Sequence, residues 1–100
     1  MAGRLSWSPR ALAELDDIAN YIAKDSPFYA RVVVRRLLDR AELLPAMPGQ
    51  GRLVPEYEGP LELREVFVHS WRVIYCVSES GIEVVTLVHG ARLIENISPL

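Results

Sequence analysis

The chain has 100 residues, half of them hydrophobic, and a formal net charge of −2. This size and composition suit one folded domain over residues 1–100 and exclude a disordered chain. The mildly acidic balance argues against a protein that holds nucleic acid mainly through phosphate contacts, although a local arginine cluster would still permit it. No apolar run approaches the ~20 residues of a membrane span, and residues 1–7 lack a signal-peptide core, so we expect a cytoplasmic protein with no membrane partner.

The first half of the chain predicts a short strand and two helices. Residues 5–7 alternate apolar and polar side chains, which is typical of a strand. Ser8-Pro9 and Ser26-Pro27 each supply an N-cap residue and a proline at the first helical position. Because almost no linker separates the helices, they should fold back as an αα-hairpin. Each helix carries an apolar stripe: Leu12, Leu15, Ile18, Ala19 and Ile22 in the first, and Ala30, Val33, Leu37, Ala41 and Leu44 in the second.

The second half predicts a loop and then a sheet. Residues 45–60 are dense in proline and glycine, so we expect no regular element there. Residues 61–68, 71–77 and 82–89 are rich in β-branched and aromatic side chains and are joined by short turns. They should form an antiparallel three-stranded meander. The predicted fold is therefore α+β, with a short N-terminal strand and an αα-hairpin packed on the meander.

The register of the last two strands follows from the turn between them. If that turn is a simple four-residue loop, its length fixes which residue of 82–89 lies opposite each residue of 71–77. Arg72 and His89 would then project from the same face of the sheet. The expected pairs are Val77 with Ile82, Tyr75 with Val84, Arg72 with Leu87 and Trp71 with Val88.

The side chains that could carry chemistry are arginines and one histidine. The sequence has no glycine-rich phosphate loop, no cysteine and histidine cluster with metal spacing and no serine-nucleophile motif, so we expect neither a metal nor a cofactor. What remains is a constellation around the predicted sheet and its preceding loop: Arg52, Arg64, Arg72, His89 and Arg92.

Each central candidate has a structural interpretation beside the functional one. Arg72 lies in mid-strand, where it either pairs with a carboxylate or meets a phosphate or acidic partner on the open face. His89 precedes Gly90 and serves either as a general acid or base or as a corner residue bonded to backbone. Arg92 either binds an anion or bridges to a nearby carboxylate.

Three short motifs stand in order along the chain: Ser8-Pro9-Arg10-Ala11 through Leu15-Asp16-Asp17-Ile18, then Trp71-Arg72-Val73-Ile74-Tyr75, then Val88-His89-Gly90-Ala91-Arg92. In this order the sequence resembles the RelE/ParE superfamily of bacterial toxins over essentially its whole length. The resemblance implies a toxin encoded beside a cognate antitoxin. That antitoxin would wrap an extended segment over the toxin's groove and hold it inactive.

The resemblance also implies one of two activities. RelE-like members cleave messenger RNA on the ribosome with a Lys and Arg cluster and a C-terminal Tyr or His, whereas ParE-like members inhibit DNA gyrase. This chain keeps Arg72 and Arg92, but residues 63–66 lack the lysine pair of RelE-like members and no tyrosine follows Arg92. His89 is left as the only obvious proton shuttle, with Glu62 or Glu65 as carboxylate alternatives. These departures favour the ParE-like branch.

We therefore predict a non-enzymatic toxin that inhibits DNA gyrase and is neutralised by its antitoxin. One alternative is a ribosome-dependent mRNA endoribonuclease with His89, Arg72 and Arg92 in its site. Another is a non-toxic module that only binds an antitoxin. The antitoxin would lie as a helix on the hairpin or as a strand on a sheet edge. Its acidic side chains would face the predicted partner-binding arginines: Arg31, Arg35, Arg64, Arg72 and Arg92.

Overall fold

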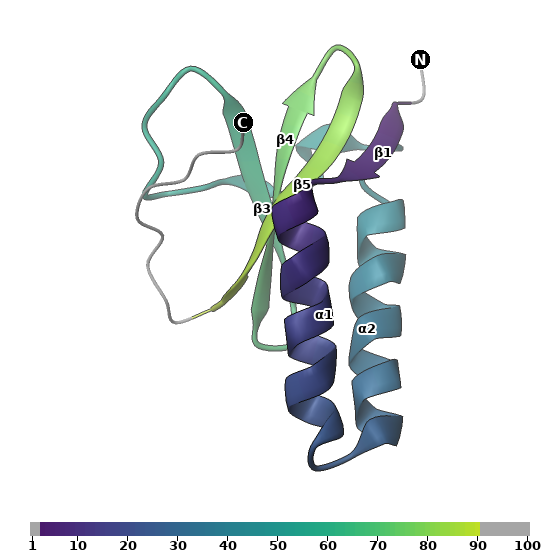
Figure 1. The fold of residues 1–100 in the computed structure, drawn as a ribbon. Helices are drawn as coiled ribbons and strands as arrows, with labels where there is room; N and C mark the ends of the chain where they lie inside the picture. Colours follow the sequence, from purple (N-terminus) through teal and green to yellow (C-terminus); the bar gives the residue numbers. More distant parts are fainter. Residues whose placement is uncertain (1–2, 91–100) are drawn as a thin grey trace.

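The computed structural model describes residues 3–90 and shows two helices packed on one five-stranded sheet (Figure 1). In chain order the elements are β1 (Arg4–Trp7), α1 (Pro9–Ala23), α2 (Pro27–Glu42), the 3₁₀ turn η1 (Pro48–Gln50), β2 (Arg52–Leu53), β3 (Glu62–Val68), β4 (Trp71–Ser78) and β5 (Gly81–His89). The strands lie in the order β1-β5-β4-β3-β2. The α+β class and the meander are confirmed. The sheet is mixed, because β1 adds to β5 in parallel.

The two predicted helix starts are confirmed, and the first of them also anchors α1 to the sheet. The Ser8 hydroxyl accepts a hydrogen bond from the N–H of Ala11 at 3.0 Å and donates one to the carbonyl of Val85 at 2.7 Å. The Ser26 hydroxyl accepts from the N–H of Tyr29 at 3.0 Å. Because Ser8 is tied to β5, the rotation of α1 about its axis is set at its first turn.

This rotation decides which side of α1 enters the core. All five residues predicted for the inner face of α2 are buried. In α1 the fully buried residue of the first turn is Ala11, whereas Leu12 is 51% exposed, so the prediction for Leu12 is wrong by one position. The cause is the Ser8 anchor, which turns the small Ala11 side chain toward β5. Neither helix within residues 3–90 is long and apolar enough to cross a membrane.

The predicted register of β4 and β5 is correct at one end and wrong at the other. Tyr75 pairs with Val84 as expected, but a β-bulge after this pair makes Ile74 the partner of Thr86. From there every partner is displaced by one, so Arg72 pairs with Val88 rather than with Leu87. A bulge places an extra residue on one strand and shifts the alternation of side chains.

The shifted register separates the two candidate residues at this end of the sheet. Trp71 pairs with His89 instead of Val88, and their rings meet edge to face with centroids 5.3 Å apart. Trp71 packs against the core beneath the helices. Since neighbouring residues on a strand point to opposite faces, Arg72 projects away from the helices. The expectation that Arg72 and His89 share a face is therefore wrong.

Residues 45–60, predicted to be irregular, contain the short elements η1 and β2. The Gln50 side chain supports this turn, because its amide donates to the carbonyls of Leu43 at 2.9 Å and Met47 at 3.0 Å. The buried hydroxyl of Tyr75 accepts from the N–H of Gly51 at 2.9 Å and donates to the carbonyl of Pro48 at 2.8 Å. In this segment, which has little regular secondary structure, these hydrogen bonds from side chains hold the backbone in place and position β2 beside β3.

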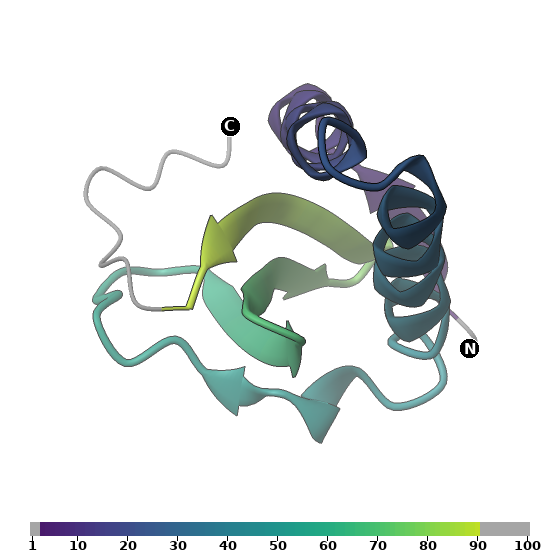
Figure 2. The same cartoon turned by 90° about the horizontal axis from the view of Figure 1, so that it is seen from below.

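A second, smaller core covers the face of the sheet away from the helices. Figure 2 shows the segment between β2 and β3 on that side of the sheet. Val54 of this segment packs with Leu63, Ile74 and Val85, which project from the sheet. Cys76 lies half-buried beside them, and burial raises the pKa of its thiol, which disfavours the reactive thiolate.

Candidate functional site

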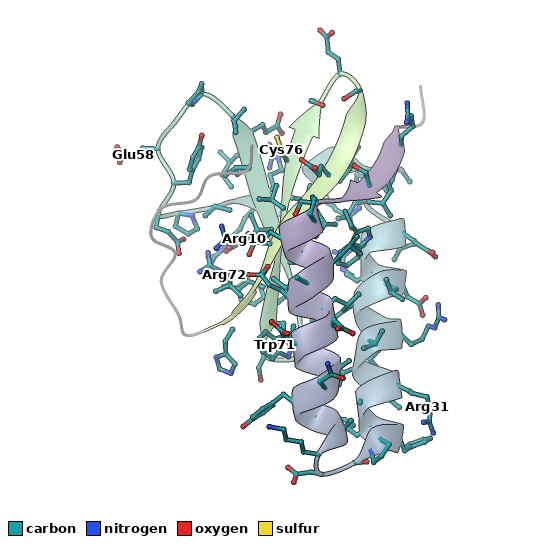
Figure 3. All side chains as sticks on the ribbon, in the orientation of Figure 1. Arg10, Arg31, Glu58, Trp71, Arg72 and Cys76 are labelled. Carbon is teal, nitrogen blue, oxygen red and sulfur yellow. The ribbon has the colours of Figure 1, made fainter. Side chains whose placement is uncertain are left out.

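Arg72, labelled in Figure 3, belongs to β4. It lies on the face of the sheet opposite the helices, where two glutamates hold its guanidinium. Its Nε donates to Oε1 of Glu65 at 2.8 Å, and Nη2 donates to the same oxygen at 2.5 Å. Nη1 and Nη2 donate to the two carboxylate oxygens of Glu56, each at 2.8 Å. The side chains of Arg72, Glu65 and Glu56 are 5%, 0% and 21% exposed. This is a buried, bidentate ion-pair network.

A second guanidinium shares the buried carboxylate of Glu65. Nε of Arg52 donates to Oε2 of Glu65 at 2.5 Å, and the Arg52 guanidinium also lies 5.5 Å from the ring centroid of Phe67. Two carboxylates thus face two guanidiniums, so the charges of Glu56, Glu65, Arg52 and Arg72 balance. The hydrogen bonds that Arg72 donates to Glu56, more than those it donates to Glu65, raise the pKa of Arg72 above its ordinary value although burial opposes them. Arg72 therefore stays charged at every physiological pH.

Arg64 serves the neighbouring loop rather than an open site. It pairs with Tyr75 across β3 and β4, so its side chain leaves the sheet on the face opposite Arg72. Its Nη1 donates to the carbonyl of Gly51 at 2.8 Å, and its Nε donates to Glu62 at 2.7 Å. These contacts hold Gly51 against the edge of the sheet.

His89 is exposed at the end of β5, on the helix side. The chain continues into Gly90, whose N–H donates to the carbonyl of Ser70 at 2.6 Å. Arg92 lies outside the described residues. Of the three residues predicted for a nuclease site, the structure places Arg72 and His89, and it does not bring them together.

Arg31 and Arg35 are exposed on α2 and border a groove along the helical hairpin. The groove has a volume of about 860 Å³, and its lining includes three small side chains: Ala19, Ala23 and Ala30. Phe28 at its end is 68% exposed, with the guanidinium of Arg31 5.9 Å from its ring centroid. Figure 1 shows that the hairpin extends well beyond the sheet, so this groove is open to a partner.

The family model of the ParE toxin of the type II toxin–antitoxin system parDE matches residues 5–94. The chain belongs to the ParE toxin family. It is thus the toxin of a type II toxin–antitoxin pair, for which the family implies a cognate antitoxin.

Two curated proteins and a solved structure are similar to this ParE-family chain. "Toxin RelE2" of Caulobacter vibrioides is 36% identical over 88 residues, which cover 87% of this chain and 94% of that protein. "Putative toxin Y4kP" of Sinorhizobium fredii is 43% identical over 49 residues, 49% of this chain and 51% of that protein. The chromosomal ParDE system from P. aeruginosa has a TM-score of 0.73 at 22% identity, covering 88% and 96% of the two chains, which shows a shared fold.

The two glutamates that hold Arg72 in this ParE-family chain were hard to identify from the sequence as its partners. The signal for Glu65 was weak, and Glu56 had none. Glu65 and Arg72 lie on strands joined by a two-residue turn, and the pairs Glu65–Ile74 and Phe67–Arg72 place them diagonally opposite on one face of β3 and β4. That relation was available from the strand pattern. Glu56 comes from the loop between β2 and β3, and nothing local indicated that it would reach Arg72.

Proposed function

We propose that this toxin inhibits DNA gyrase without cleaving nucleic acid, and that binding of its antitoxin neutralises it. The observation that carries the proposal is the engagement of Arg72 by Glu56 and Glu65. An endoribonuclease needs a cation that faces the scissile phosphate. A phosphate at Arg72 would have to displace buried carboxylates and leave their charges uncompensated, which costs several kcal/mol.

The position of His89 supports the same proposal. General acid–base catalysis needs a proton donor or acceptor within hydrogen-bond reach of the reacting group. His89 stands on the helix side of the sheet with its ring against Trp71, away from Arg72. Arg72 and His89 thus do not form a pairing of cation and proton shuttle at one phosphate. The ParE family match and the net charge of −2 favour gyrase over the ribosome's RNA surface.

One observation favours ribosome-dependent cleavage of messenger RNA as a second candidate function. The Caulobacter relative, which covers most of the chain, is named RelE2. If that function held, His89→Ala and Arg92→Ala would abolish cleavage of ribosome-bound message. The third reading, a non-toxic antitoxin-binding module, requires that expression of the chain leave bacterial growth unchanged.

A supercoiling assay with purified gyrase and relaxed plasmid tests the proposal. We expect micromolar toxin to block supercoiling and equimolar antitoxin to restore it. Relaxation by topoisomerase I is the matched control, and it should continue at the same toxin concentration. Full supercoiling at micromolar toxin, or cleavage of ribosome-bound message by the toxin alone, would refute a gyrase-directed function. Such a toxin would act in the cytoplasm, where gyrase meets the chromosome.

For the antitoxin we propose an amphipathic helix in the hairpin groove, with acidic side chains beside Arg31 and Arg35. Arg31 and Arg35 are open to a partner, whereas Arg72 and Arg64 are engaged within the toxin. The Arg31→Glu/Arg35→Glu variant should associate with the antitoxin roughly tenfold or more slowly, and added salt should shrink the difference. Arg4→Glu, an exposed charge reversal on β1, is the control, and it should leave the association rate unchanged.

A further inference from the structure

A basic groove lies between α2 and the turn that joins β3 to β4. Its volume is about 430 Å³, and its lining includes Arg36, Asp39 and Arg40 of α2 and His69 of the turn. Arg36 and Arg40 are one helical turn apart, about 6 Å along the axis, so they stand on the same side of α2. The hairpin groove lies on the other side of this helix, and Arg36 and Asp39 border both.

Neutral side chains hold both guanidiniums of this groove. Nη1 of Arg36 donates to Nε2 of His69 at 3.0 Å, and Nη1 of Arg40 donates to the side-chain oxygen of Gln50 at 2.6 Å. Because a guanidinium can only donate, Nε2 of His69 is the acceptor and carries no proton. Among residues 3–90, neither arginine lies within ion-pair distance of a carboxylate. The fold thus positions two positive charges here without neutralising them.

The acidic side chain of the lining does not cancel these charges. The carboxylate of Asp39 lies 3.5 Å from Arg35, a third arginine of α2. In the network around Arg72, by contrast, a carboxylate faces each guanidinium. The groove therefore keeps an excess of positive charge that suits an anionic partner.

The turn places His69 beside Arg36 in an unusual backbone conformation. His69 has a φ of +53°, and it is the one non-glycine residue with a positive φ within residues 3–90. A positive φ at the first position of a two-residue hairpin turn is the pattern of a type II′ turn, where glycine is usual. The Tyr29 ring meets the imidazole edge to face with centroids 6.3 Å apart. Strained backbone of this kind is retained where the position of a side chain matters, and here that position holds Arg36.

The overall charge of the chain limits which phosphates could reach this groove. Guanidiniums match phosphate oxygens, and arginines make many of the backbone contacts of DNA-binding proteins. The net charge of −2, however, opposes the approach of free DNA. Gyrase, the proposed target, holds a DNA duplex, so a toxin docked on the enzyme would meet phosphates at a high effective concentration.

We propose that Arg36 and Arg40 bind backbone phosphates of the DNA that gyrase holds, and that His69 positions Arg36 for this contact. This inference rests on the proposed action on gyrase and adds the duplex itself as a second part of the target. The contact is made to the sugar–phosphate backbone, so it carries no preference for a base sequence. The toxin should therefore bind the gyrase–DNA complex more tightly than it binds gyrase alone.

The Kd of the toxin for gyrase, measured with and without a bound DNA duplex, tests the inference. At low salt we expect the duplex to lower Kd by about tenfold or more. A fourfold rise in salt should reduce this advantage by about tenfold, as expected for two neutralised phosphates. Binding to gyrase that DNA does not improve would overturn the inference and leave the proposed target intact. No binding to gyrase in either form would refute the proposed target itself.

Two paired variants separate a phosphate contact from a contact with protein. Arg36→Gln/Arg40→Gln should lose the DNA advantage and bind gyrase alone as the wild type does, whereas Arg36→Lys/Arg40→Lys keeps the charge and should retain most of the advantage. Arg4→Gln, an exposed position on β1, is the control and should behave as the wild type. An equal loss of affinity with and without DNA would assign the two arginines to an acidic protein surface and overturn the inference. If the double glutamine variant fails to fold, Arg36→Gln alone decides, because it should lower the salt slope by about one unit.

His69→Gly tests the positioning role. Glycine accepts the positive φ without strain, so the variant should unfold at the wild-type temperature or above it. Because Arg36 loses its partner, the DNA advantage should fall several-fold while the Kd for gyrase alone stays unchanged. A His69→Gly variant that keeps the full DNA advantage would overturn the positioning role of His69.

Discussion

Replacement of the central ion pair, Arg72 with Glu65, is the most informative perturbation of the fold. Both side chains are almost fully buried, with 5% and 0% exposure. Removing one member leaves the other buried with one ion-pair partner instead of two, Arg52 for Glu65 or Glu56 for Arg72, which costs up to about 3–5 kcal/mol. Arg72→Met and Glu65→Leu should each lower the free energy of unfolding by that amount. Replacing both members with apolar side chains of similar size costs far less. The double variant should therefore lose less free energy of unfolding than the two single variants lose together.

Urea unfolding followed by circular dichroism measures these free energies. We expect a coupling energy between the two substitutions of at least about 2 kcal/mol. Arg52 is 61% exposed and Glu56 is 21% exposed, so water can solvate their charges once the central pair is gone. Additive effects, or an Arg72→Met variant as stable as the wild type, would refute the argument that this cluster is structural.

Three further predictions concern local structure. Ser8→Ala should lower the free energy of unfolding by about 1–3 kcal/mol, more than Ser26→Ala, because Ser8 both caps α1 and bonds the buried carbonyl of Val85; equal losses in urea melts would contradict this. Gly81 has a φ of +132°, and a Cβ at this position would collide with the backbone of Arg4. Gly81→Ala should therefore lower the free energy of unfolding by about 1–3 kcal/mol. Gly49 lies in open space, so Gly49→Ala should have little effect on thermal unfolding. Burial raises the pKa of Tyr75 above its ordinary 10.0, so unfolding should become easier as pH rises past that value; absorbance at 295 nm should show a late-ionising phenol that Tyr75→Phe removes.

The elements that local chemistry defines were predictable from the sequence. Ser8-Pro9 and Ser26-Pro27 mark both helix starts because capping uses neighbouring backbone groups. The inner face of α2 follows from its spacing alone. In α1, Leu15, Ile18 and Ile22 lie at the core as predicted, whereas the first turn buries Ala11 instead of Leu12, because a bond between Ser8 and Val85, far apart in sequence, sets the rotation of that helix.

The arrangement of the site depended on contacts that sequence periodicity does not contain. The β-bulge beside Tyr75 moves His89 to the face opposite Arg72, and no turn length indicated it. Glu56 reaches Arg72 from a loop whose path is set by the contacts of Gln50 and Tyr75. The choice between an ion pair and an open phosphate site at Arg72 could therefore be made only from the folded structure.

Gyrase inhibition by a toxin that lacks Arg72 tests the central claim most directly. The Arg72→Met/Glu65→Leu variant, assayed below its unfolding temperature, should block supercoiling at the same concentration as the wild type, and antitoxin should relieve the block. This result is expected because Glu56 and Glu65 hold the Arg72 guanidinium within the fold. A folded variant that no longer inhibits gyrase, or a wild-type cleavage of ribosome-bound message that the variant has lost, would contradict the account.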